Sequence, residues 1–422
     1  MRLSTAADHR DGRSGEPRSR DGSTPTQLAP SPTESTDRPM AGAPAAEDDG
    51  VVLYRPPRSA RPAPRVDVTL RDPRTLSLAD RSAWSRLSGT SAEPNPFFAS
   101  GFVEPATRHL PTGSGVRLLV ARDAERWIAC VPVVADRRWR RARVPCLRTW
   151  THPYGFLGTP LLDGEDPERA ASALLQAAGW RPLLALEGVR ADGPVAAALT
   201  AAAPQGMHVL HRVERAALTR RSVAEPVSRP GRRRREHARL RRRLDDELAA
   251  PSEVREIAPS RQAAERFLTL EASGWKGRSG TAMGADPTHQ AFFHALCSGT
   301  DPALGVTMLE LGTADRTAAS LVLLHAGLEV FAFKLAHDDA LGSGAPGALL
   351  LGASRRWFRD ATAAERLDSC AAPDQALANR TWTDRTPIAS FVVPGPGVAG
   401  AAVGIGLQTA IRRRLARQAA RG

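Results

Sequence analysis

The sequence predicts an α/β (α+β) fold of two successive units, each a mixed, largely antiparallel sheet flanked by helices, after a disordered N-terminal segment. Three observations carry this prediction. From residue 66 onward, apolar runs of strand length alternate with longer runs of helix length. Each half of this region contains a β-hairpin pattern among helix patterns. A chain of 422 residues is also long enough for two medium domains with apolar cores.

The N-terminal segment is predicted to be disordered over residues 1–65. Residues 1–50 contain no Val, Ile, Phe, Trp or Tyr, so they cannot bury enough apolar surface to fold. Residues 51–65 continue as a linker rich in Pro and Arg. The first twelve residues, MRLSTAADHRDG, lack the apolar stretch of a secretion signal, so we expect a cytoplasmic protein.

The first folded unit is expected at residues 66–225. A polar turn separates its first two apolar runs, which predicts a hairpin, and two alanine-rich helical runs separate the later strands. The expected elements are strands at 116–121 and 127–134, a helix near 167–178, a strand at 183–186, a helix near 194–203, and a strand at 208–218.

The second folded unit is expected at residues 226–395, followed by a basic tail at 396–422. It opens with an arginine-rich helix whose acidic end allows i,i+4 ion pairs. Helices are expected near 261–273, 287–297 and 346–358, and strands at 306–311, 318–324, 330–335, 366–370 and 388–393, the last of which closes the unit. The tail contains an apolar stretch at 397–407, which can lie on a membrane surface but is too short to cross a bilayer.

The charge composition has two interpretations. There are 58 basic and 45 acidic residues, for a net charge of +13, and only two of the basic residues are lysines, Lys276 and Lys334. An arginine excess can mark a surface that binds nucleic acid or a membrane, or it can reflect a GC-rich genome. The arginines are spread over the whole chain, which favours the second interpretation. The two lysines are then candidate sites where a compact ammonium group is required.

A strand, a glycine-rich loop and a helix follow one another from Val330 to Phe358. Such an arrangement can bind a pyrophosphate at the helix N-terminus, although an ordinary turn has the same pattern. Strict alternation places Phe331, Phe333 and Leu335 on one face of the strand and Ala332, Lys334 and Ala336 on the other. Lys334 then points either toward a ligand or toward water at a sheet edge.

The second lysine lies in a glycine-flanked Trp–Lys pair, Trp275 and Lys276, directly after an apolar helix. A tryptophan beside an ammonium group can contact a planar or anionic ligand. The alternative is a helix C-terminus with a packing tryptophan.

Four ordered motifs in the second unit resemble a known family. GWKGRSGTAM, FAFK followed by HDD, APGALL and LDSCAAPDQALANRTW resemble the CelD-type, BioF-like branch of the GNAT N-acyltransferase superfamily, which is related to the FemABX aminoacyltransferases. NPFFASGFV and THPYGFLGTPLL resemble the first domain of that family. The resemblance covers about residues 75–395.

The resemblance implies two tandem GNAT-like domains, with acetyl-CoA or another acyl-CoA bound as co-substrate in the second. It implies an amine that attacks the thioester directly, a backbone N–H near Phe333 and Leu335 that meets the oxyanion, and a general base. The residues implied to bind the pyrophosphate are Gly344, Ala345, Gly347 and Ala348. The implied catalytic residues are Asp368 as the first choice of base, Asp338, Asp339 and Lys334. The implied substrate-binding residues are Trp275, Lys276, Tyr154, Asp374, Asn379 and Trp382; Asp374 is also a candidate base.

Two features of the sequence depart from the GNAT pattern. Gly344 and Leu349 replace the first and last residues of the usual phosphate loop. Many GNAT enzymes use a tyrosine to protonate the leaving thiolate, but the only tyrosine outside the linker is Tyr154, in the first unit. Either Tyr154 reaches the second unit, or water or another group supplies this proton.

The leading interpretation is an acyl-CoA-dependent N-acyltransferase acting on an amine of a small molecule, a sugar or a cell-envelope precursor. One alternative is a FemABX-like transferase that uses aminoacyl-tRNA, with the helix from Arg229 to Arg243 on the RNA. The other is an inactive GNAT scaffold that binds nucleic acid or an anionic membrane. No metal is expected, because His152 and His337 lack metal-ligand spacing. The four cysteines are too widely spaced for a metal-type pair and are expected to be free thiols in a reducing compartment.

Overall fold

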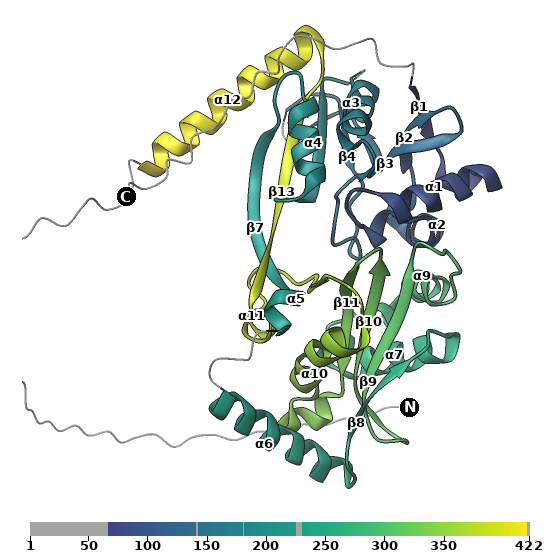
Figure 1. The fold of residues 1–422 in the computed structure, drawn as a ribbon, viewed down its shortest axis with the longest axis vertical. Coiled ribbons are helices and arrows are strands. Elements are labelled where there is room, and N and C mark those ends of the chain that lie inside the picture. The colour runs from purple at the N-terminus through teal and green to yellow at the C-terminus, as the bar shows by residue number, and fades with distance from the viewer. Residues whose placement is uncertain (1–65, 141, 180, 225–229, 420–422) are drawn as a thin grey trace, which may run out of the picture. The chain divides into compact units, whose positions relative to one another are not determined.

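The strands of the described chain form one mixed sheet in a computed structural model that describes residues 66–140, 142–179, 181–224 and 230–419 (Figure 1). Thirteen strands belong to it, in the order β1-β2-β3-β4-β6-β13-β7-β12-β11-β10-β9-β8, with β5 paired to β3. Their bounds are β1 Asp67–Arg71, β2 Arg117–Asp123, β3 Arg126–Asp136, β4 Cys146–Thr149, β5 Leu161–Leu162, β6 Leu183–Arg190, β7 His208–Thr219, β8 Glu253–Ile257, β9 Gly305–Gly312, β10 Thr317–Ala326, β11 Glu329–His337, β12 Arg366–Asp368 and β13 Asp384–Pro394.

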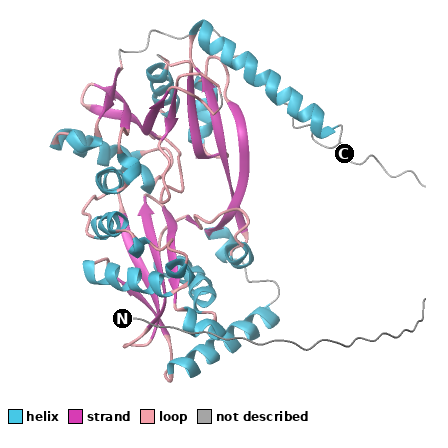
Figure 2. Cartoon of the chain, turned by 180° about the vertical axis from the view of Figure 1, so that it is seen from behind, coloured by secondary structure: helices cyan, strands magenta, loops and turns pink. Residues whose placement is uncertain are grey.

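Helices flank this sheet (Figure 2), so the predicted fold class is confirmed. The α-helices are α1 Leu78–Thr90, α2 Ser100–His109, α3 Pro167–Ala178, α4 Pro194–Ala202, α5 Arg220–Ala224, α6 Pro230–Leu248, α7 Arg261–Ser273, α8 Trp275–Arg278, α9 Pro287–Cys297, α10 Pro346–Ala361, α11 Ala376–Thr381 and α12 Gly397–Ala419. Helices α3, α7 and α9 have the predicted bounds, because each begins at a proline or after a serine cap and presents a clear apolar face. The expected disordered segment, 1–65, lies outside the described residues.

The apolar core lies on both faces of the sheet. In the second half of the chain, α7 and α9 bury Phe267, Phe292 and Phe293 in one core, together with Phe331 of β11. A second core contains residues of α10 and α11. Strands β9, β10 and β11 contribute buried residues to both cores, so both faces of this part of the sheet are covered.

The last strand differs from the prediction. We expected the strand near 388–393 to close the second unit, but β13 lies between β6 and β7, two strands of the first. In turn, β7 continues past β13 to pair with β12 through Ala217, Leu218 and Thr219. The sequence pattern shows that β13 is a strand, but strand partners are non-local and alternation does not encode them. The domain boundary at 225/226 stays a prediction.

Polar contacts connect the first and second halves of the chain, both between strands of the sheet and between helices that lie beside it. Arg190 of β6 is buried and forms an ion pair with Glu329 of β11 and a longer one with Glu93. Asp301, which follows α9, accepts hydrogen bonds from Gly101 N and Ser100 Oγ, each 2.7 Å long, and so caps α2 from 200 residues away. These contacts fix α2 and α9 beside β11, where the candidate site lies.

None of the helices in the described ranges has both the length and the apolar character needed to cross a membrane.

Candidate active site

Strand β11 leaves its neighbour β12 after three residues. The two strands run parallel and pair through Glu329, Val330 and Phe331 only. From Ala332 to His337, none of the described strands pairs with β11 on that side, and β11 pairs only with β10. Unpaired backbone N–H and C=O groups along such an edge can bind an extended ligand.

A β-bulge at Phe333 corrects the predicted faces of β11. Lys334 pairs with Val322 and Ala332 with Leu323, so Phe333 is the extra residue. A bulge interrupts the alternation of side chains, and bulges commonly re-aim a side chain at a functional site. The prediction that Lys334 shares a face with Ala332 is therefore wrong. Its ammonium group instead lies on the same side of the sheet as Tyr154, which packs against Phe333.

The two lysines of the chain meet at one buried carboxylate, Glu271 of α7. The Nζ of Lys276 lies 3.0 Å from Oε1 of Glu271 and donates a 3.3 Å hydrogen bond to the Leu335 carbonyl of β11. The Nζ of Lys334 lies 3.8 Å from the same carboxylate oxygen. Met283 N donates to Oε2, so the carboxylate is held on both sides. This cluster brings together two predicted site residues, Lys276 and Lys334.

In this cluster, the side chain of Lys334 has a pKa well below that of an ordinary lysine. Burial and the nearby charge of Lys276 lower its pKa, Glu271 opposes both effects, and the resulting pKa is about 8. At 3.8 Å, its ion pair with Glu271 is longer than the 3.0 Å pair that Lys276 forms with the same oxygen. A lysine with a pKa near neutrality can act as a general base.

Tyr154 reaches this cluster from the first half of the chain. Lys334 Nζ lies 4.8 Å from the centre of its ring, and its hydroxyl lies 2.9 Å from Nδ1 of His289 on α9. Burial raises the pKa of Tyr154, so the phenol stays protonated. A neutral phenol beside a basic amine can donate a proton during the reaction. The neighbouring His152 has its pKa lowered to about 4 by burial, so it is neutral near pH 7.

The loop after β11 leads into the uncapped N-terminus of α10. Ala345 adopts a left-handed conformation with φ 47°, and no side chain caps the helix. Gly347, in the first turn, lies close to His337: a β-carbon there would lie 3.2 Å from Nδ1. Gly344 lies against Leu244 of α6, and Ser343 donates a hydrogen bond to Glu247 of the same helix. The N-terminus of α10 can therefore bind an anion, and α6 forms a wall of this loop.

Several predicted catalytic residues lie in other environments. Asp368 is fully buried and forms a two-point ion pair with Arg215, at 2.7 and 2.8 Å. Asp339 pairs with Arg278 at 2.6 Å and lies 3.3 Å from His337. Asp338 pairs with Arg316 at 2.6 Å. Of these carboxylates, Asp339 lines a cavity of about 30 Å³ together with Glu271, Lys276 and Leu335.

The described contacts of the predicted substrate-binding residues after β12 lie outside the lysine cluster. Trp382 is fully buried in the core beneath α10 and donates to the Leu351 carbonyl. Asn379 donates to the Pro373 carbonyl within its own loop, and Asp374 is exposed. The side chain of Trp275 lies outside what the structure describes.

Two residues of the cluster were missed by the sequence prediction. The sequence around Glu271 could have indicated its role, because this carboxylate stands between Leu270 and Ala272 in α7, five residues before Lys276. No sequence pattern indicates His289, because its position beside Tyr154 depends on how α9 packs. The described ranges contain no group of three or more His, Cys, Asp or Glu side chains able to hold a metal. Burial raises the pKa of all four free thiols, which disfavours a nucleophilic thiolate.

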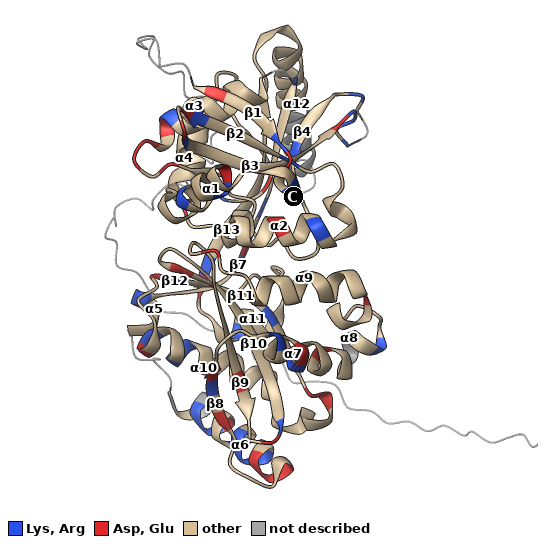
Figure 3. Ribbon diagram, turned by 90° about the vertical axis from the view of Figure 1, so that its right-hand side faces the viewer, with Lys and Arg blue, Asp and Glu red and all other residues tan. Residues whose placement is uncertain are grey.

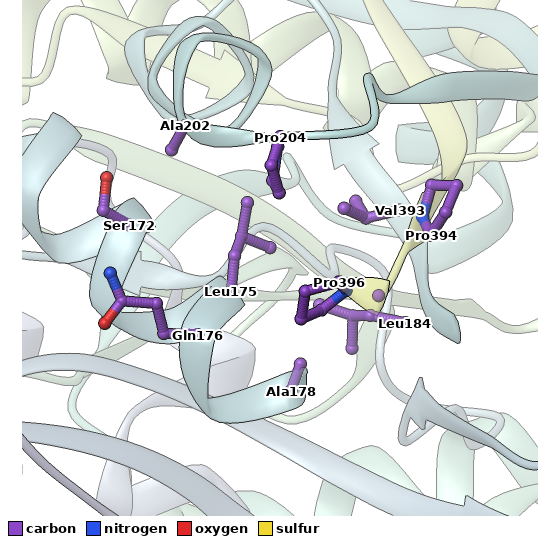
Figure 4. A pocket seen from close by; sticks show the side chains of 11 residues that line it. Ser172, Leu175, Gln176, Ala178, Leu184, Ala202, Pro204, Val393, Pro394 and Pro396 are labelled. Carbon is purple, nitrogen blue, oxygen red and sulfur yellow. The ribbon is translucent and has the colours of Figure 1, made fainter. Parts of the chain in front are cut away.

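The largely apolar pocket of about 300 Å³ in Figure 4 is separate from this cluster. It lies between α3, α4, β6 and the end of β13, and Leu175, Leu184, Pro204, Val393 and Pro396 are among its lining residues. No titratable side chain lines it, so it offers no group for catalysis.

Comparison with known proteins places these features in context. Residues 231–392 match the family model of the acetyltransferase (GNAT) domain. No curated protein sequence matches the chain. A conserved protein of unknown function from Bacteroides thetaiotaomicron VPI-5482 is 13% identical, over 78% of this chain and 100% of that one, with a TM-score of 0.50. This likeness supports the fold alone.

Two further solved structures have TM-scores of 0.49. The C-terminal domain of a putative lysylphosphatidylglycerol synthetase from Agrobacterium fabrum is 12% identical, over 79% of this chain and 95% of that one. FemX is 10% identical, over 74% of this chain and 96% of that one.

Proposed function

Because residues 231–392 match the family model of the acetyltransferase (GNAT) domain, we propose that the chain is an acyltransferase that transfers an acyl group from acyl-CoA to an amine. The acceptor amine belongs to a small molecule, a sugar or a cell-envelope precursor, and acetyl is the expected acyl group. The observation that carries the proposal is the position of Lys334, with its pKa of about 8, on the unpaired part of β11 that leads into the uncapped end of α10. Free cysteines fit a cytoplasmic location.

In the proposed reaction, the amine nitrogen attacks the thioester carbonyl carbon while Lys334, in its neutral form, accepts the proton that the nitrogen loses. Backbone N–H groups of β11 near Phe333 and Leu335 stabilise the oxyanion. The C–S bond then breaks, and Tyr154 donates a proton to the thiolate. The proton gained at Lys334 balances the one lost by Tyr154, and transfer of one proton from the Lys334 ammonium group to the Tyr154 phenolate returns both groups to their starting states.

The donor would bind with its pyrophosphate at the N-terminus of α10, from Gly344 to Ala348. The uncapped helix end and the closeness of Gly347 to His337, which leaves little room for a side chain, support this position. Binding of CoA, measured by calorimetry, together with thiol release from acyl-CoA in the presence of amine acceptors, tests the proposal. It fails if neither CoA binding nor thiol release is detected.

A second candidate donor is aminoacyl-tRNA. The observation that favours it is α6, which packs on the donor loop and carries exposed arginines at 234, 235, 242 and 243, although Figure 3 shows acidic residues on the same helix. Transfer that requires charged tRNA and is abolished by RNase, without CoA binding, would select this candidate.

The pH dependence of turnover tests the role of Lys334. The base must be neutral, so kcat/KM should rise with pH through about 8 and then level off. The Glu271→Gln change removes the charge that raises the Lys334 pKa, so the midpoint should fall. Lys276→Met removes the charge that lowers this pKa, so the midpoint should rise. Identical midpoints in the wild type and both variants would contradict this assignment.

Donor binding is tested at Gly347. We expect Gly347→Asp to raise the KM for acyl-CoA by about tenfold or more, because a carboxylate there would compete with the pyrophosphate for the helix end, while the helix itself is not weakened. The matched control is Gly352→Asp, one and a half turns further along α10, which should leave this KM nearly unchanged. Equal effects of the two variants would argue against phosphate binding at this helix end.

A further inference from the structure

Helix α12 has an exposed apolar face with no partner among the described residues. Val398 is 89% exposed and Ile405 is 67% exposed, and Ala402 between them is also exposed. Residues 398, 402 and 405 follow helical spacing, so they share one face. The exposure of two such large apolar side chains on one helix calls for a partner, because isolated exposed residues are ordinary but aligned ones mark contact surfaces.

The opposite face of α12 attaches the helix to the sheet. Leu407 is buried and Val403 is partly buried, in a small core with Leu183 and Val392. The turn that begins α12 is tightly packed: a β-carbon at Gly400 would lie 1.7 Å from the Gly395 carbonyl. The first half of α12 is therefore fixed to the end of β13, where Figure 1 shows it leaving the sheet, and its outer face cannot simply turn inward.

Apolar surface continues from α12 onto the body of the protein. Pro396, which directly precedes the helix, lines the apolar pocket of Figure 4. Val209 at the start of β7, which is 49% exposed, pairs with Phe391 of β13, three residues before the end of that strand. Three of the five most exposed large apolar side chains of the described residues, Val209, Val398 and Ile405, thus belong to this end of the sheet.

The charge of residues 397–422 indicates what kind of partner the exposed face of α12 binds. From Gly397 to the last residue of the sequence there is no Asp or Glu, whereas five arginines occur, at 412, 413, 414, 417 and 421. An apolar stretch followed by a purely basic one suits a surface that is apolar inside and negatively charged outside. A nucleic acid would use the arginines but would leave Val398 and Ile405 without a role.

We propose that α12 is a docking element for an anionic lipid bilayer, with Val398, Ala402 and Ile405 in the headgroup region and with the net positive charge of the sequence after them attracted to the anionic headgroups. This goes beyond the proposed acyl transfer and does not depend on it. It implies that the protein works at a membrane surface even if its acceptor is soluble.

The test is sedimentation of the full-length protein with vesicles of phosphatidylglycerol and phosphatidylcholine, compared with vesicles of phosphatidylcholine alone. We expect binding to the anionic vesicles only, weakened by salt. The double change Val398→Asp and Ile405→Asp should weaken this binding at least tenfold. A triple change of Arg412, Arg413 and Arg414 to glutamine should weaken it by about 100-fold, from roughly 1 kcal/mol for each arginine near the surface.

The matched control is Leu78→Asp, which adds the same charge at an 80% exposed leucine of α1. It should bind vesicles like the wild type, and circular dichroism should show all variants folded. The proposal is overturned if the wild type does not bind anionic vesicles, or if the α12 double variant binds them as well as Leu78→Asp does. Binding of RNA that depends on the arginines, without vesicle binding, would also overturn it.

Discussion

Replacement of Lys334 by methionine is expected to lower the kcat/KM of acyl transfer by 10²- to 10⁴-fold, the usual contribution of a general base. Methionine retains the apolar part of the side chain beside Tyr154 but cannot accept a proton. Lys334→Arg should be equally impaired, because a guanidinium group does not lose its proton at accessible pH. Initial rates of thiol release, measured as a function of donor and acceptor concentration, give kcat/KM for each variant.

Lys276→Arg is the matched control for this experiment. Lys276 is already paired with Glu271 at 3.0 Å, and an arginine can keep that ion pair, so we expect a much smaller loss. The two substitutions remove the only lysines of the chain by the same change. If Lys334→Arg turns over acyl donor at the wild-type rate, Lys334 is not the base. If both variants are equally inactive, the cluster acts as a unit and the pH profiles of the Glu271 and Lys276 variants must assign the roles.

Much of the fold was predictable because local signals determine helices and strands. Proline or serine caps and apolar periodicity located α3, α7 and α9 within their true bounds, and composition alone located the two lysines as residues of interest. The place of β13 was not predictable, since its partners β6 and β7 lie about 200 residues away in the sequence. Strand pairing at that distance depends on packing rather than on the pattern of either strand.

Only part of the candidate site could be predicted from the sequence. One of the features that could not be predicted is local, and the other depends on contacts between distant parts of the chain. The β-bulge at Phe333 places Lys334 on the face of β11 opposite to the one that strict alternation predicts. Position 333 is neither glycine nor proline, so the sequence contains no local indication of a bulge. Tyr154 contacts Lys334 and His289 only after α9 and β11 pack against the first half of the chain. The family resemblance and its place at the end of a short strand favoured Asp368, but neither could show that Arg215 of β7 pairs with that carboxylate.

Loss of Arg215 should strongly destabilise the fold. Arg215 is about 95% buried and Asp368 is fully buried, and the Phe156 carbonyl also accepts a hydrogen bond from the guanidinium group. Arg215→Met would leave a buried carboxylate without its partner, which costs about 3–5 kcal/mol. We expect a decrease of this size in the free energy of unfolding, measured by denaturant titration. The matched control is Arg212→Met, an exposed arginine on the same strand, which should change it by less than about 0.5 kcal/mol.

The double change Arg215→Met and Asp368→Leu separates a structural role of Asp368 from a catalytic one. Replacing both members of a buried ion pair by apolar residues of similar size is often neutral, so the double variant should regain most of the lost stability. Since Asp368 is occupied by Arg215 and fully buried, we also expect the refolded double variant to keep its acyl transfer within a few-fold of the wild type. A stable double variant that lost 10²-fold or more in turnover would restore Asp368 as the base and remove that role from Lys334.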